Sequence, residues 1–233
     1  MRRDSFYLFF FLLYLSPLAY AEIDKVYHPY VEAYKKELEY RTLYKNDNNQ
    51  SHLDGLQVHS LSFAMSLTEQ FSLEAYVIAR NPPMDRFSVS TFELEAIYQL
   101  TEQGEYWADW GLLFELERDT ALNKWEGGVS LLSEKQWGRW NGTINFSVDY
   151  EYGSGIQDEF ETVLHSQIKY RASPLIEPAI ELYMDEETRG IGPALLGTVR
   201  TGHNKLKWEL GVIFGFNGRT ANENVRFLLD YEF

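Results

Sequence analysis

The segment that decides the fold is Val225–Phe233, with the sequence VRFLLDYEF. Its odd-numbered positions all carry apolar or aromatic residues, whereas its even-numbered positions carry Arg226, Leu228, Asp230 and Glu232. Because successive side chains of a β-strand point to opposite faces, this alternation gives one apolar face and one mainly polar face. The segment is therefore predicted to be a two-faced strand.

The same alternation recurs along most of the chain. It is regular in five further segments, which are residues 92–100, 106–117, 143–152, 160–171 and 206–216. Less regular strands are expected at 35–45, 56–67, 71–80, 124–134, 176–185 and 193–201. Most of these segments are close to the roughly 9–11 residues that a tilted strand needs to cross a bilayer. The sequence therefore predicts an all-β, up-and-down antiparallel barrel of about twelve strands.

The connections between the expected strands alternate in length. Short turns are expected at 68–70, 101–104, 136–138, 172–174 and 202–204. Longer polar links are expected at 45–55, 81–86, 118–123, 153–158, 186–192 and 217–224, and Gly190 and Gly192 before Pro193 are interpreted as part of a turn. Short turns on the periplasmic side and longer loops on the outer side are expected of a membrane barrel.

Aromatic residues gather at the ends of the expected strands. Five of the six tryptophans lie beside the short turns, and these are Trp107, Trp110, Trp137, Trp140 and Trp208. Tyrosine and phenylalanine lie beside the longer links, as at Tyr44, Tyr150, Tyr152 and Phe216. Two aromatic bands are typical of the membrane–water interfaces of a barrel. The alternative is a soluble β-sandwich, which would instead gather its aromatic residues in the middle of the strands.

The N-terminus is interpreted as a secretory signal peptide over residues 1–21. A short charged start is followed by the apolar run Ser5–Leu18 and by Ala19-Tyr20-Ala21, a small-residue cleavage site. The alternative is an uncleaved anchor, but the run is short for a spanning helix, which needs about 20 apolar residues. Cleavage after Ala21 removes two arginines and one aspartate, so the formal charge changes from -14 to −14 − 1 = −15.

Composition excludes several classes of protein. The chain of 233 residues has no cysteine, so it has neither a disulfide framework nor a thiolate metal site. Its acidity disfavours nucleic acid as a partner, because phosphates repel it. A mean hydropathy of -0.36 excludes a bundle of membrane helices. It does not exclude a membrane barrel, in which only alternate residues face lipid.

The alternation, the asymmetry of the connections and the terminal Tyr231-Glu232-Phe233 resemble those of Gram-negative outer-membrane β-barrel proteins of a porin-like kind. The resemblance covers residues 31–233 and implies an outer-membrane location, with membrane lipid as a partner. It implies that Tyr231 and Phe233 form the insertion signal that barrel-assembly machinery recognises. Residues 22–30 are then expected to be a periplasmic lead-in, and the first strand should pair with the last near Tyr40 and Phe227, because no backbone edge is tolerated in lipid. The oligomeric state stays open.

If the apolar faces meet lipid, the opposite faces line the lumen and are mainly acidic. The candidate lumen-lining residues are Glu39, Arg41, Glu93, Glu95, Asp109, Glu115, Glu117, Asp149, Glu151, Glu161, Lys169, Arg171, Glu181, Glu209, Arg226 and Asp230. Carboxylates along a pore favour cations, so the leading hypothesis is a passive channel for small cationic or neutral solutes. The alternative is a barrel plugged by charges that pair across the lumen, with a structural or docking role.

A third hypothesis is an outer-membrane lipid-modifying enzyme, so the chain was searched for a nucleophile and its base. The known outer-membrane phospholipase family places His and Ser two residues apart on one strand face. Here His59-Ser60 and His165-Ser166 are direct neighbours that point to opposite faces, so neither pair forms a catalytic unit within one strand. His52 and Asp54 offer only two metal ligands, so no metal site and no cofactor are predicted. The chain is therefore predicted not to be an enzyme.

Overall fold

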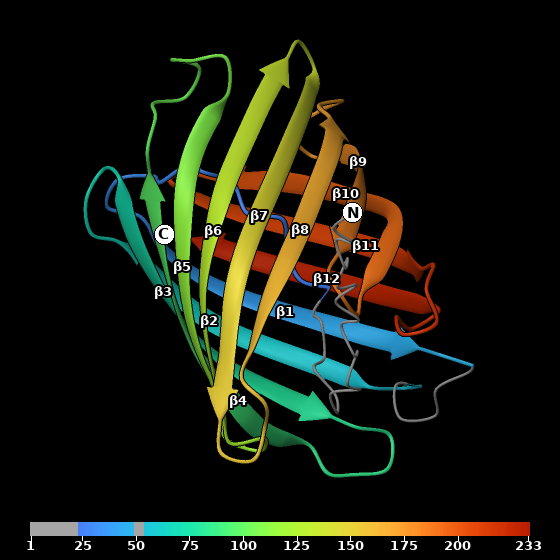
Figure 1. The fold of residues 1–233 in the computed structure, drawn as a ribbon. Coiled ribbons are helices and arrows are strands. Elements are labelled where there is room, and N and C mark those ends of the chain that lie inside the picture. The colour runs from blue at the N-terminus through green and yellow to red at the C-terminus, as the bar shows by residue number, and fades with distance from the viewer. Residues whose placement is uncertain (1–22, 49–53) are drawn as a thin grey trace, which may run out of the picture.

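The computed structural model describes residues 23–48 and 54–233, which form a closed barrel of antiparallel strands (Figure 1). The signal peptide expected at residues 1–21, and His52 in the first long loop, lie outside the described residues. In the part of the chain that the structure describes, no helix has the length and apolar character needed to span a membrane.

Twelve strands follow one another around the wall. They are β1 Lys36–Asn46, β2 Gln57–Ser66, β3 Phe71–Asn81, β4 Ser88–Gln99, β5 Asp109–Asp119, β6 Lys124–Trp137, β7 Trp140–Gly153, β8 Glu159–Tyr170, β9 Glu177–Met184, β10 Arg189–Thr201, β11 Asn204–Gly215 and β12 Glu223–Glu232. Each strand pairs with its neighbours in sequence, and β1 closes the barrel on β12 with Tyr40 opposite Leu229 and Thr42 opposite Phe227. The predicted fold class and the predicted closure are confirmed.

The wall is apolar on its outside and polar on its inside. In β7 the outward side chains of Ile144 and Phe146 are 52% and 48% exposed, whereas the inward Asn145 and Asp149 are 3% and 8% exposed. A soluble β-sandwich would bury the first pair and expose the second. Backbone groups in hydrocarbon must all be paired, and a closed barrel pairs them without leaving an edge. The apolar outer belt therefore faces lipid.

Exposed aromatic side chains mark both ends of this belt. Trp137 and Trp140 lie at the short β6–β7 turn, and Trp125 and Tyr152 lie at the opposite ends of the same two strands. Hereafter the end that holds the β6–β7 turn is called the short-turn end, and the opposite end is called the long-loop end. Two aromatic bands separated by an apolar belt match the two interfaces of a bilayer.

Several strand boundaries differ from those expected from the sequence, and two of the differences have a clear physical reason. Gly190 and Gly192 were expected in a turn before Pro193, but they lie within β10. A side chain at Gly192 would collide with the backbone carbonyl of Val212, so this glycine permits a close approach of β11 rather than a chain reversal.

The second difference concerns the start of β5. Tyr106 and Trp107 were expected in that strand but belong to the preceding turn. There the Asp109 carboxylate accepts a hydrogen bond from Gly104 N, and Trp110 N donates to Thr101 Oγ1, at 2.7 and 2.9 Å. These side-chain bonds hold the longer turn in place, and alternation of apolar residues does not reveal them.

The chain before β1 runs inside the barrel. Residues 22–30 were expected to lie outside it as a periplasmic lead-in, but the described residues 23–30 lie in its interior. Ile23 and Val26 are 3% and 5% exposed and pack against Tyr183 and Ile213 towards the long-loop end. Val31 N donates to Gln99 Oε1, 2.8 Å away, near the short-turn end. Residues 23–31, called the N-terminal segment below, therefore run along the lumen.

Candidate functional site

All sixteen candidate lumen residues have their side chains on the inner side of the wall. Ten of them are buried, namely Glu39, Arg41, Glu95, Asp109, Asp149, Glu151, Lys169, Glu181, Arg226 and Asp230. The other six, Glu93, Glu115, Glu117, Glu161, Arg171 and Glu209, are half-buried. The proposed insertion-signal residues Tyr231 and Phe233 instead lie on the outside, 40% and 54% exposed.

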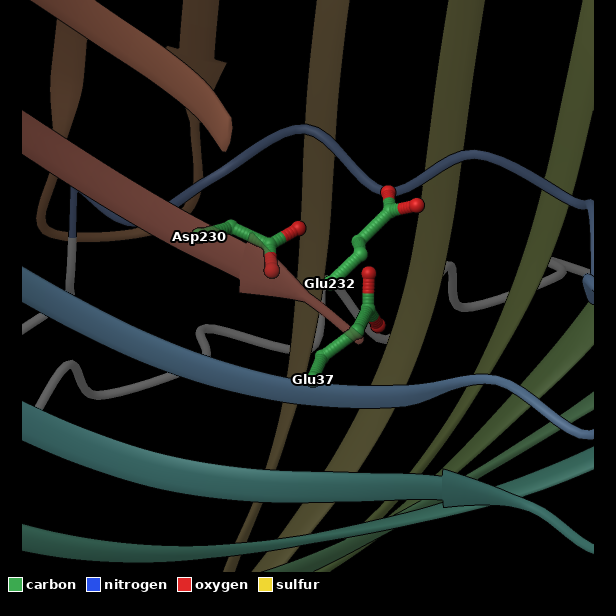
Figure 2. Close-up of side chains that lie close together, drawn as sticks. All are labelled: Glu37, Asp230 and Glu232. Atoms are coloured by element: carbon green, nitrogen blue, oxygen red, sulfur yellow. The ribbon is translucent and has the colours of Figure 1, made fainter. Parts of the chain in front are cut away.

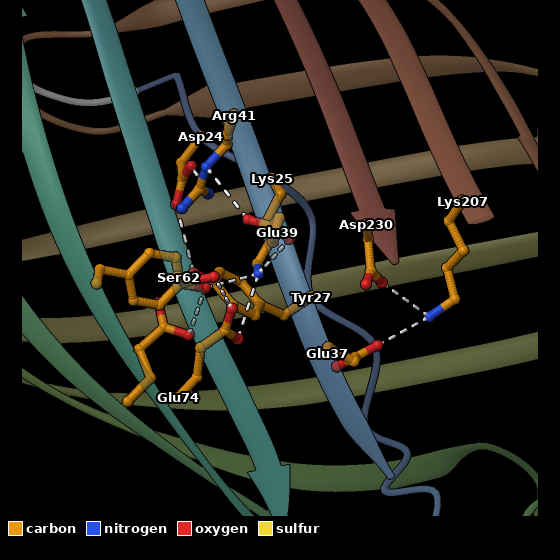
Figure 3. Close-up of polar contacts among 12 residues, drawn as sticks. Asp24, Lys25, Tyr27, Glu37, Glu39, Arg41, Ser62, Glu74, Lys207 and Asp230 are labelled. Carbon is orange, nitrogen blue, oxygen red and sulfur yellow. Dashed lines mark hydrogen bonds and ion pairs between the residues drawn. The ribbon is translucent and has the colours of Figure 1, made fainter. Parts of the chain in front are cut away.

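Charged side chains of the N-terminal segment pair with inward residues of β1 and β3 (Figure 3). Lys25 Nζ lies 3.1 Å from Glu39 Oε2 and 3.6 Å from Glu74 Oε2, and it donates to Tyr76 Oη at 2.7 Å. Asp24 forms an ion pair with Arg41. The carboxylates of Glu39 and Glu74 thus compensate the positive charge of the Lys25 ammonium group inside the barrel.

Tyr27 lies at the middle of the segment and is bonded to the wall through its backbone and its side chain. Its backbone N–H donates to Asn145 Oδ1 and its carbonyl accepts from Asn145 Nδ2, each at 2.8 Å. Its hydroxyl donates to Glu95 Oε1. Its ring packs against Leu113 and Leu132, which are 1% and 0% exposed. Tyr27 is thus fixed to the part of the wall that the four neighbouring strands β4 to β7 form.

Residues 28–30 of the segment are bonded to the wall at the short-turn end. His28 Nδ1 contacts the Glu134 carboxylate, and Tyr30 Oη donates to Asp109 Oδ2 at 2.7 Å. Between them, Pro29 lies against Gly111 of β5, where an added Cβ would be only 3.0 Å from the Cα of Pro29. Gly111 therefore leaves the room that the segment occupies.

A second buried network lies beside the segment and has Arg226 at its centre. Arg226 is 0% exposed and its Nη2 lies 2.7 and 2.9 Å from the two carboxylate oxygens of Glu181, which is also 0% exposed. Its Nη1 lies 2.8 Å from Glu209 Oε2. Gln167 Nε2 and Tyr183 Oη donate to the same Glu181 carboxylate at 2.8 and 3.0 Å. These inward charges pair between strands β9, β11 and β12, which lie on one side of the barrel, rather than across the lumen.

A third charged cluster closes the seam between the first and last strands. Glu37 of β1 and Asp230 and Glu232 of β12 converge on one another (Figure 2). Lysines surround these three carboxylates: Lys207 Nζ lies 3.3 Å from Glu37 and 3.2 Å from Asp230, and Lys35 and Lys205 lie 2.7 and 3.0 Å from Glu232. The cluster therefore carries its own counter-charges.

The space that remains in the lumen divides into cavities at its two ends. A cavity of about 120 Å³ at the long-loop end, called the acidic cavity below, has nine carboxylates in its lining against two basic side chains, Arg80 and Lys124. These carboxylates belong to Asp24, Glu93, Glu115, Glu117, Glu126, Asp149, Glu151, Glu161 and Asp185. Two overlapping cavities of about 280 and 620 Å³ lie at the short-turn end, and lysines and arginines share their lining with carboxylates. Tyr27 borders both the acidic cavity and the 280 Å³ cavity, so it separates the two ends.

The interior does not bring together a serine and a histidine. His59 lies on the lipid-facing side and its Nδ1 is 2.9 Å from Tyr40 Oη, while the His165 ring packs against Tyr183. Among residues 23–48 and 54–233, no histidine forms a hydrogen bond with a serine hydroxyl. The described part of the chain therefore shows no serine–histidine pair of the kind that the phospholipase family uses.

The N-terminal segment is the functional feature that the sequence analysis missed. It is a short irregular stretch with no repeat of apolar residues, and its backbone bonds to side chains of distant strands. One sequence signal could have pointed to it: Gly111 falls on the inward face of its strand, where a glycine leaves room in the lumen. The structure shows what fills that space.

No protein-family model and no curated protein matches this sequence. Solved structures match its fold at low sequence identity. A KdgM porin in complex with disordered oligogalacturonate shares 13% identity at a TM-score of 0.56, over 84% of this chain and 98% of the porin. An outer-membrane channel from Pseudomonas putida F1 shares 16% identity at a TM-score of 0.54, over 91% of this chain and 99% of the channel. The β domain of a Bordetella autotransporter shares 12% identity at 0.50, over 86% and 99%. The chain thus has the fold of a bacterial outer-membrane barrel.

Proposed function

We propose that this barrel is a passive outer-membrane channel for small cationic or neutral solutes, narrowed at its middle by the N-terminal segment. The observation that carries the proposal is the acidic cavity, in which nine carboxylates face two basic side chains. Such an excess of carboxylates over basic side chains would be costly in a dry interior, so this lining favours water and mobile cations.

The short-turn end supports the same proposal from the other side. Its two cavities reach up to the N-terminal segment, and Tyr27 of that segment borders the acidic cavity as well. A segment that is joined to the wall at one end and bonded to it by side chains is easier to displace than a strand of the wall. Displacement of residues 23–28 would join the cavities into one passage. The porin and the Pseudomonas channel, which share the fold, support a channel as the general activity.

The test is ion conductance of the refolded protein in planar bilayers with a salt gradient across them. A channel with this lining is expected to give a reversal potential shifted from zero towards the equilibrium potential of the cation. Displacement of the N-terminal segment is expected to raise the conductance. A heat-modifiable shift on a detergent gel identifies correctly folded protein in the same sample. Folded protein that carries no current, both unaltered and with the segment released, would overturn the proposal.

A second candidate function is a plugged barrel with a structural or docking role. The buried N-terminal segment favours it, because Ile23, Val26 and Tyr27 are 3%, 5% and 7% exposed and fill the interior. The Arg226–Glu181 pair adds to the filling. The absence of conductance after release of the segment would support this candidate in place of the channel.

A further inference from the structure

Three carboxylates on adjacent strands converge beside the acidic cavity. Glu93 and Glu95 belong to β4 and Glu115 belongs to β5, and Glu95 and Glu115 are paired across the two strands. One carboxylate oxygen from each of the three lies within 4.8 Å of the other two. Glu95 is 1% exposed, and Glu93 and Glu115 are half-buried.

None of these three carboxylates forms a direct ion pair with a basic side chain that the structure describes, although Lys25 and Arg41 lie near enough to act on Glu95 electrostatically. The basic side chains nearest to them, Lys25 and Arg41, are instead paired with Glu39 and Asp24.

The hydrogen bonds that the three carboxylates accept come from neutral groups. They are the hydroxyls of Tyr27 and Tyr76 to Glu95 and that of Ser130 to Glu115. The seam cluster of Glu37, Asp230 and Glu232 makes the contrast, because three lysines neutralise it. Like charges this close need a cation between them or a proton on one of them.

An independent observation at the same place points to a cation. Asp149 of β7 is 8% exposed, lines the acidic cavity together with Glu93 and Glu115, and its Oδ1 has no hydrogen-bond partner. That oxygen lies over Gly128, where an added Cβ would collide with it and would lie 3.3 Å from Glu115 Oε2. The Asp149 and Glu115 oxygens thus both lie over the bare backbone of Gly128. A buried carboxylate oxygen without a donor is a free ligand position.

We propose that Glu93, Glu95 and Glu115 hold one divalent cation of the calcium type at the wall of the acidic cavity, with Asp149 as a further carboxylate at the edge of the site. The donors are all carboxylate oxygens, which suit Ca²⁺ or Mg²⁺ rather than zinc, because zinc sites use nitrogen and sulfur ligands. Ca²⁺ accepts several protein carboxylates in irregular geometry, whereas Mg²⁺ keeps more of its water. The adjoining cavity of about 120 Å³ leaves room for water to complete the coordination.

This site goes beyond the proposed channel, because the cation is held whether or not the barrel conducts. Binding is therefore measured on the full mature chain, folded in detergent with no membrane potential. Calorimetric titration with Ca²⁺ and, separately, with Mg²⁺ gives stoichiometry and affinity. The heat-modifiable gel shift identifies folded protein for every variant, so loss of binding is separated from loss of fold.

The unaltered barrel is expected to bind one Ca²⁺, and Mg²⁺ at least tenfold more weakly. Glu93→Gln with Glu115→Gln abolishes binding, and Asp149→Asn alone weakens it at least tenfold. Glu37→Gln in the seam cluster leaves it unchanged and serves as the matched control. Folded unaltered protein that shows no saturable Ca²⁺ binding overturns the proposal, as does Ca²⁺ binding that survives the Glu93→Gln/Glu115→Gln change. Conductance of the same samples is scored separately, so a failed channel and a failed site give different results.

Discussion

The peptide groups of Tyr27 and the side-chain amide of Asn145 are joined by two hydrogen bonds, each 2.8 Å long. Asn145 lies near the middle of β7 and is 3% exposed. The Asn145 side-chain amide therefore bonds to Tyr27 as a neighbouring strand would. It satisfies the backbone N–H and the carbonyl of Tyr27, a residue that belongs to no strand. This pair accounts for the position of the N-terminal segment better than any single charge, because buried backbone groups must find partners.

Asn145→Ala is expected to loosen the N-terminal segment. The change leaves two backbone groups of Tyr27 without partners, and each costs about 1–3 kcal/mol when buried. Single-channel recording should show a higher conductance, and trypsin should gain access to Lys25. Asn145→Asp retains the hydrogen-bond acceptor and loses the donor, so its conductance and its cleavage by trypsin should lie between those of the unaltered protein and those of Asn145→Ala. Unchanged conductance and unchanged cleavage in Asn145→Ala would show that the segment is held by other contacts.

Gly111→Val is expected to push the segment out of the lumen. An added Cβ at this position would lie 3.0 Å from the Cα and Cβ of Pro29, and overpacking of this kind costs about 1–3 kcal/mol. The measured result should again be a higher conductance in a barrel that still shows its gel shift. Gly127→Val is the control, because nothing lies within 4 Å of a Cβ added there. Equal conductance of the two variants would contradict the close approach of Pro29.

Arg226→Ala is expected to destabilise the barrel itself. The change leaves the buried Glu181 carboxylate without its bidentate partner, which typically costs about 3–5 kcal/mol. Urea unfolding in detergent, followed by the gel shift, measures the loss. Adding Glu181→Gln to the same chain should recover part of the stability, because the uncompensated charge is removed. A variant as stable as the unaltered barrel would mean that the network contributes little.

Glu117→Gln with Glu161→Gln is expected to reduce the preference for cations. Both side chains line the acidic cavity, so their neutralisation weakens the attraction of cations at the long-loop mouth. The reversal potential in a salt gradient should move towards zero. Glu69→Gln with Glu105→Gln removes the same charge from exposed turns at the other end and should leave the potential unchanged. An equal shift in both double variants would point to net charge rather than to the cavity.

The wall of the barrel could be predicted from the sequence because lipid imposes one simple rule on alternate residues. In β7 that rule separates Ile144 from Asn145, and the structure confirms strand number, pairing order and closure. Strand ends were less predictable. The β4–β5 turn is held by hydrogen bonds from backbone N–H groups to the side chains of Thr101 and Asp109. The close approach of β11 at Gly192 depends on Val212 of that strand.

The interior was only partly predictable. Alternation identified which side chains point inwards, but the height of each in the barrel depends on the register of twelve strands. For that reason the sequence indicated a generally acidic lumen, whereas the structure concentrates the excess of carboxylates at the long-loop end. The path of the N-terminal segment depends on contacts such as that of Tyr27 with Asn145, between residues far apart in sequence, and no local pattern encodes it.

The lysines around Glu37, Asp230 and Glu232 also bear on the kinetics of assembly. They lie where β1 meets β12, the strands that are farthest apart in the chain, whereas every other junction in the wall joins consecutive strands. Contacts of such long range form slowly, because the intervening chain must first give up its freedom. Electrostatic attraction acts over a longer distance than a backbone hydrogen bond, so these ions would help two late-meeting ends find their register. The junction between β1 and β12, which closes the barrel, is thus stabilised by its own set of ion pairs.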